Sequence, residues 1–157
     1  TITAHELHDH AAMSKHFKTL ARYLDLSDIK TSVSQRRDWF ESEEIQAYPG
    51  PDWELLSSVQ HSKLLNQPFH ISKLSNRMGI QLEELVSNQL EDLPTNPVFP
   101  GTVQLTPGGK FIVLMRDAGV TGGYPRILHL TEEGQSKLAQ KRVGDPIRFQ
   151  LLETITG

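Results

Sequence analysis

The side chains best suited to chemistry lie at one connection between two apolar segments. An expected strand, 111–115, runs into a carboxylate, and a second expected strand, 126–130, follows a pair of glycines. Glycine tolerates positive φ and lets the backbone come close to a bound group. A carboxylate, a hydroxyl and backbone N–H groups at one connection predict a small polar pocket, although a tight turn with a surface ion pair explains the same pattern. The candidate residues are Asp117, Thr121, Gly122, Gly123 and Tyr124.

A second candidate is the segment 75–79, which carries Asn76 and Arg77 beside a glycine. A planar guanidinium next to an amide suits a two-pronged grip on a carboxylate or phosphate. The alternative is that Arg77 pairs with Glu83 or Glu84 and only closes a turn.

The third candidate is Gln104, at the end of the segment 100–104. On an inward strand face its amide would need a ligand or a buried partner, because an unpaired buried amide is costly. On an outward face it would simply be solvated. The nearby Gly108-Gly109-Lys110 is not a phosphate loop, because that loop requires glycine where Gln104 stands.

Composition narrows the function classes. The formal net charge of -3 and the pI of about 6.1 give no basic field for nucleic acid or an anionic membrane. Cysteine is absent, which excludes disulfides and thiol catalysis. No apolar run approaches the roughly 18 residues of a membrane span, and no signal-peptide pattern occurs, so we expect a cytoplasmic protein.

Histidines cluster near the start without metal-binding His-Glu-x-x-His spacing, so we expect solvated helix faces and no metal site. These histidines are His5, His8, His10 and His16.

Apolar spacing divides the chain into two parts. Residues 1–30 show helical spacing and predict a helical arm, with a linker to residue 35 and a second domain over 36–157. The second part shows short strands separated by turns and two short helices, capped by Asp52 and Thr131. This pattern predicts a mainly β barrel or sandwich. The expected strands are 45–48, 69–74, 78–82, 98–105, the fully buried 111–115, 126–130 and 147–152.

Several segments together resemble one family, the biotin-dependent carboxyltransferase-like family, also called allophanate hydrolase subunit 2 or the KipA family. It includes the C component of 5-oxoprolinase. The chain looks like the C-terminal half of such a protein. The matching segments are Tyr48-Pro49-Gly50-Pro51-Asp52-Trp53, Ser75-Asn76-Arg77-Met78-Gly79, Pro100-Gly101-Thr102-Val103-Gln104, Ile112-Val113-Leu114-Met115-Arg116-Asp117, Thr121-Gly122-Gly123-Tyr124-Pro125-Arg126-Ile127, Leu138-Ala139-Gln140 and Gly144-Asp145-Pro146-Ile147-Arg148-Phe149.

The resemblance implies a cyclophilin-like β-barrel that works only in a complex. The expected partners are the A component of 5-oxoprolinase and its KipI-like B component, which with the C component form an ATP-dependent enzyme opening 5-oxoproline to glutamate. The alternatives are a carboxyltransferase that moves a carboxyl group from biotin to urea, and a non-catalytic regulator that binds a KipI-like kinase inhibitor.

The resemblance also implies roles for the candidate residues. Asp117 would handle protons, and the two glycines would donate backbone N–H groups. Arg77 would bind the anionic group of the substrate, whereas Gln104 and Tyr124 would fix its ring. We expect Arg77, Gln104, Asp117 and Tyr124 to converge on one concave site. The remaining expected substrate contacts are Asn76, Thr121, Gly122 and Gly123.

Overall fold

The computed structural model describes residues 41–152 of the chain, and the residues from Glu43 onward form a compact unit of their own. The expected helical arm over 1–30 and its linker lie outside the described residues. No described helix is long and apolar enough to cross a membrane.

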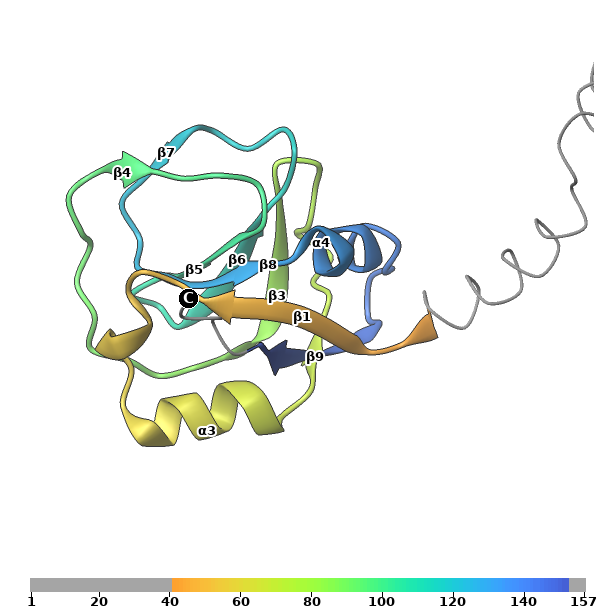
Figure 1. Ribbon diagram of the computed structural model, residues 1–157, viewed down its shortest axis with the longest axis horizontal. Helices are drawn as coiled ribbons and strands as arrows, with labels where there is room; N and C mark the ends of the chain where they lie inside the picture. Colours follow the sequence, from red (N-terminus) through yellow and green to blue (C-terminus); the bar gives the residue numbers. More distant parts are fainter. Residues whose placement is uncertain (1–40, 153–157) are drawn as a thin grey trace, which may run out of the picture. The chain divides into compact units, whose positions relative to one another are not determined.

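Seven strands form one sheet that nearly closes on itself. Its order is β2-β9-β1-β8-β5-β6-β3, and the two edge strands β2 and β3 meet through an antiparallel bridge between Ile71 and Leu82. All neighbours run antiparallel except β1 and β9, which lie side by side in parallel (Figure 1). The mainly β barrel expected from the sequence is therefore confirmed. The strands are β1 (Glu44–Pro49), β2 (Phe69–His70), β3 (Gly79–Leu85), β5 (Thr102–Leu105), β6 (Lys110–Leu114), β8 (Arg126–Leu130) and β9 (Pro146–Leu151).

Apolar side chains from almost every strand fill the barrel. The rings of Phe69, Phe111 and Phe149 form its aromatic centre, with Phe69 and Phe111 edge to face at a centroid distance of 5.5 Å. Such pairs add about 0.5–1.5 kcal/mol beyond the burial of their area. Because β2 and β9 lie at one edge of the sheet and β6 lies next to the opposite edge, the three rings join the two ends of the sheet across the barrel interior.

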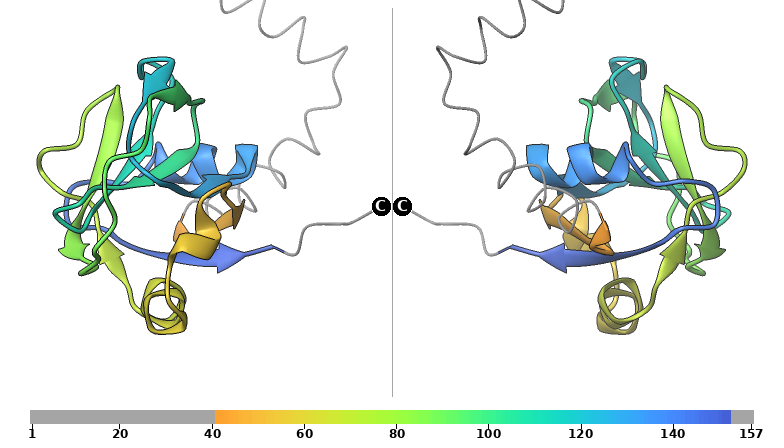
Figure 2. Two further views of the ribbon diagram at one scale, coloured as in Figure 1. Left: turned by 90° about the vertical axis from the view of Figure 1, so that its left-hand side faces the viewer. Right: turned by 90° about the vertical axis from the view of Figure 1, so that its right-hand side faces the viewer.

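Two short helices flank the barrel. The helix α3 (Ser58–Asn66) lies against β9, and α4 (Glu132–Leu138) packs on β1 and β8 (Figures 1 and 2). As expected, Thr131 caps α4, because its hydroxyl accepts a hydrogen bond from the N–H of Gly134 at 2.9 Å. The expected cap at Asp52 is wrong. Its side chain makes no cap bond at the 3-10 helix Trp53–Leu55, and α3 is capped instead by Ser57.

The structure differs from the sequence-based expectation in the length, start or burial of several strands. The strand predicted at 69–74 is only two residues long, because the N–H of Ser72 turns to the carbonyl of Gln81 and the chain then bends. The strand predicted at 98–105 begins at Thr102. The strand β6, expected to be fully buried, alternates between buried and half-buried residues. The hairpin turn between β5 and β6 is confirmed, with Gly109 at φ +85°.

A two-stranded ribbon carries the diglycine segment. It consists of β4 (Asn96–Pro97) and β7 (Thr121–Gly122), and Figure 1 shows it apart from the main sheet. The ribbon is continuous in sequence with β5 and β8, so it holds the candidate pocket residues beside the barrel.

Candidate functional site

Arg77 and Asp117 form an ion pair at the surface. The Nε atom of Arg77 lies 2.9 Å from Oδ2 of Asp117, and the two side chains are 89% and 45% exposed. The alternative pairing of Arg77 with Glu83 or Glu84 is wrong, since Glu84 bonds to His70 instead. An exposed pair of this kind contributes at most about 1 kcal/mol to stability. Both groups therefore remain accessible to an incoming anion.

Asn76 shapes the loop that presents Arg77. Its Oδ1 atom accepts hydrogen bonds from the N–H groups of Met78 at 2.8 Å and Gly79 at 3.2 Å, which makes a side-chain-closed turn. A surface hollow of about 230 Å³ lies beside this turn. Its lining includes Asn76, Met78, Gln81, Ile112, Ala118 and Gly119. The sequence neighbours of Arg77 and Asp117, and not the two residues themselves, line this hollow.

Gln104 is the most buried of the candidate side chains. It lies on β5 and is only 5% exposed, so the solvated alternative is wrong. Its Nε2 atom donates to the carbonyl of Tyr124 at 3.3 Å, and its Oε1 atom accepts no hydrogen bond from any described residue. Among the described residues, Nε2 of Gln67 is the one fully buried side-chain nitrogen or oxygen without a partner, so Oε1 of Gln104 is reached by solvent and can accept a hydrogen bond from a ligand.

The two glycines are required by close packing. A Cβ atom on Gly122 would lie 2.7 Å from Nε2 of Gln104, and one on Gly123 would lie 3.0 Å from the carbonyl oxygen of Leu93. Neither glycine has positive φ. The backbone at both glycines thus lies close to other protein atoms and does not use the left-handed conformation, whereas close approach to a bound group stays a prediction. The ribbon places Gly122 opposite Asn96 and Thr121 opposite Pro97.

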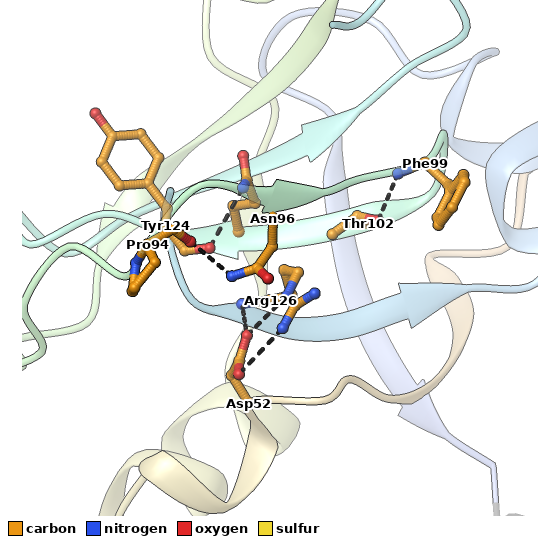
Figure 3. A network of polar contacts seen from close by, with 8 residues as sticks. Asp52, Pro94, Asn96, Phe99, Thr102, Tyr124 and Arg126 are labelled. Atoms are coloured by element: carbon orange, nitrogen blue, oxygen red, sulfur yellow. Dashed lines mark hydrogen bonds and ion pairs between the residues drawn. The ribbon is translucent and has the colours of Figure 1, made fainter. Parts of the chain in front are cut away.

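A largely buried ion pair missed by the sequence analysis lies beside Tyr124. Oδ2 of Asp52 accepts hydrogen bonds from the backbone N–H and the Nε of Arg126, both at 2.9 Å. Figure 3 shows this pair beneath Asn96 and Tyr124. Burial alone would raise the pKa of Asp52, but the hydrogen bonds and charge of Arg126 outweigh it and hold that pKa below its usual value. Asp52 is therefore ionised at neutral pH.

The candidate residues form two groups along the connection from β6 to β8. One holds Arg77 and Asp117, and the other holds Gln104, Gly122 and Tyr124. No hydrogen bond or ion pair between described side chains joins the two groups. Their convergence on one concave site, and the role of each residue toward a ligand, stay predictions.

Comparison with known proteins gives consistent matches. The family model described as "Carboxyltransferase domain, subdomain A and B" matches residues 6–151. The C component of 5-oxoprolinase from Escherichia coli K12 is 38% identical over 107 residues, and that from Haemophilus influenzae Rd is 31% identical over 108 residues. These alignments cover 67% and 68% of this chain but only 34% and 35% of the relatives. The chain thus matches about a third of the length of these curated relatives.

A solved structure shares the fold. The urea amidolyase of K. lactis superposes with a TM-score of 0.64 over 70% of this chain and 7% of its own. Sequence identity is 19%, so this likeness concerns the fold alone.

Proposed function

Because the chain belongs to the carboxyltransferase domain family, subdomain A and B, we propose that it is a constituent of 5-oxoprolinase corresponding to part of the C component. In this proposal it acts in the cytoplasm with an A component and a KipI-like B component, and the complex hydrolyses 5-oxoproline to glutamate at the expense of ATP. The names of the two curated relatives support this assignment.

The observation that carries the proposal is the unpartnered amide oxygen of Gln104. A cyclic amide presents one N–H donor and one carbonyl acceptor. Because Nε2 of Gln104 is held by the Tyr124 carbonyl, the side chain presents Oε1, which matches the N–H of a lactam. A site that pairs this acceptor with a substrate N–H discriminates against analogues lacking that N–H, because such analogues lose the hydrogen bond.

The Arg77–Asp117 pair suits the remaining chemistry. The carboxylate of 5-oxoproline would compete with Asp117 for the guanidinium of Arg77, which can bind carboxylates through two parallel hydrogen bonds. Asp117, released from the ion pair, would then be available to accept a proton. General bases of this kind contribute about 10²–10⁴-fold to rate.

The glycine pair before Lys110 does not form the phosphate-binding loop found in many ATP-binding proteins. Gly108-Gly109 forms a hairpin turn in which the N–H of Gly109 bonds to the carbonyl of Thr106. That geometry is not a phosphate-binding loop. The biotin-dependent alternative draws on the family name, and the likeness to urea amidolyase adds only the shared fold.

The test is turnover by a reconstituted complex. The chain is combined with the A and B components, and glutamate formed from 5-oxoproline is measured with and without ATP. We expect ATP-dependent glutamate release that Gln104→Ala lowers sharply but leaves measurable, and that the exposed control Gln150→Ala leaves unchanged. Carboxylation of urea with biotin and no lactam opening would favour the carboxyltransferase. Tight binding of the KipI-like B component without any turnover would favour the regulator.

A further inference from the structure

Residues 50–52 and 126–127 hold each other through five hydrogen bonds. Two join the backbones, from the N–H of Gly50 to the carbonyl of Ile127 at 2.8 Å and from the N–H of Asp52 to the carbonyl of Arg126 at 3.2 Å. The other three end on the Asp52 carboxylate. Its Oδ2 accepts from the N–H and Nε of Arg126, both at 2.9 Å, and its Oδ1 accepts from Nη2 at 3.5 Å.

A series of hydrogen bonds along residues 124–126 links this contact to the side-chain amide of Gln104. The three residues 124–126 are tied in succession. The carbonyl of Tyr124 accepts from Nε2 of Gln104 at 3.3 Å, and the carbonyl of Pro125 accepts from the N–H of Leu105 at 3.0 Å. The N–H of Arg126 donates to Asp52. Figure 3 shows Asp52, Arg126 and Tyr124 following one another along this path.

We propose that Asp52 is a positioning residue for substrate binding, which acts through Arg126 to hold the Tyr124 carbonyl and thereby to aim the oxygen of Gln104 at the substrate. The inference rests on the proposed function. If the Tyr124 carbonyl moves, the amide of Gln104 loses the contact that distinguishes its nitrogen from its oxygen. The side-chain amide can then rotate so that Nε2 instead of Oε1 faces the substrate. Two N–H donors, one from Gln104 and one from the lactam, would then face each other.

Two observations separate this role from general support of the fold. The Asp52 side chain makes no helix-cap bond, so Arg126 is the partner to which its carboxylate is committed. The approach is also unusually close, because a Cβ on Gly50 would lie 2.2 Å from the carbonyl oxygen of Arg126. Glycine at position 50 therefore allows the Asp52 carboxylate to reach the backbone N–H of Arg126 as well as its side chain.

The chain offers a matched control in a second Arg–carboxylate pair. Nε of Arg148 lies 3.5 Å from Oε2 of Glu43, with both side chains about half exposed, and this pair makes no hydrogen bond to the segment 124–126. Arg148→Ala removes this more exposed ion pair and the hydrogen bond from Nη1 of Arg148 to the carbonyl of Asn66, and neither contact lies on the path to Gln104. A change produced by Asp52→Asn but not by Arg148→Ala therefore reports on position rather than on charge in general.

The first experiment needs no activity. In the ¹⁵N-labelled 157-residue chain, the side-chain NH₂ signals of Gln104 are identified by their loss in Gln104→Ala. We expect Asp52→Asn to shift these signals and Arg148→Ala to leave them in place. If Asp52→Asn does not fold, Asp52→Glu is used, since it keeps the negative charge but lengthens the side chain and so displaces the carboxylate from the backbone N–H of Arg126. Unshifted Gln104 signals in the folded variant overturn the proposal.

The second experiment is a double-mutant cycle in the reconstituted complex. We expect Asp52→Asn to lower kcat/KM for 5-oxoproline by about tenfold, mainly through KM, and by less than about twofold when Gln104→Ala is already present. Losses that multiply overturn the positioning role. If the unmodified complex opens no lactam, the proposed function fails instead, while the Gln104 signals still decide whether Asp52 positions that side chain.

Discussion

Replacing Gly122 by alanine should disturb the candidate site directly. The new Cβ would lie 2.7 Å from Nε2 of Gln104, which is closer than real Cβ contacts allow. Gln104 is only 5% exposed, so its amide has little room to swing away. Either the amide or the β4–β7 ribbon must therefore move, and the hydrogen bond to the Tyr124 carbonyl is lost.

The expected cost has two parts. Forcing an extra methyl group into a packed region costs about 1–3 kcal/mol. The lost hydrogen bond costs about 0.5–1.5 kcal/mol. We therefore expect Gly122→Ala to lower the free energy of unfolding by about 1.5–4.5 kcal/mol, which lowers the urea midpoint by about 0.75–2.25 M at an m-value of about 2 kcal/mol/M.

The assay is urea unfolding followed by circular dichroism, with Gly119→Ala as the control. Gly119 lies in the same connection, but the nearest atom to its added Cβ is 3.9 Å away and its φ is not in the left-handed region. We expect that variant to change stability by no more than about 0.5 kcal/mol. Equal midpoints for the two variants would refute the packing of Gln104 against Gly122.

Three further results are expected. Gly50→Ala should destabilise the fold by about 3 kcal/mol or more in the same urea assay, because its Cβ would lie 2.2 Å from a backbone oxygen of Arg126; a loss of under about 1 kcal/mol would contradict this. The pKa values of Asp52 and Glu84 are lowered from their usual 3.8 and 4.5 by hydrogen bonds that outweigh burial. The two carboxylates should therefore stabilise the fold fully above pH values of 3.8 and 4.5, and this contribution should be lost as pH falls through their lower pKa values in the folded state. Between pH 6 and pH 3 the urea midpoint should therefore fall less steeply in the Asp52→Asn variant than in the unmodified chain. Asp117→Asn should lower turnover by about 10²–10⁴-fold and stability by at most about 1 kcal/mol, whereas full activity would remove Asp117 from the mechanism.

Local signals in the sequence were sufficient for several elements. The alternation in β1 and β9, the hairpin turn ending at Gly109 and the Thr131 cap each depend on residues within a few positions of one another. The pattern of short strands left a barrel and a sandwich open, and the resemblance to the family indicated the barrel. Its closure depends on the bridge between Ile71 and Leu82, where a predicted six-residue strand is reduced to two residues.

Long-range pairings account for what the sequence did not reveal. Asp52 precedes a helical turn and therefore reads as a cap, yet its partner Arg126 lies 74 positions away. Alternation alone could not place Gln104 inside or outside, because its strand is buried at every position. Both Asp52 and Arg126 lie in the segments that carry the family resemblance, and a search for opposite charges shared between such segments could have suggested the pair.

The most direct test compares two ligands that differ only in the ring N–H. Affinities of the reconstituted complex for 5-oxoproline and for the corresponding lactone, in which oxygen replaces that N–H, are measured by calorimetry with Gln104 intact and in Gln104→Ala. If Oε1 of Gln104 binds the lactam N–H, the intact complex prefers the lactam by about tenfold or more and Gln104→Ala removes most of that preference. Equal preference in both proteins would contradict the assignment of Gln104 to the lactam.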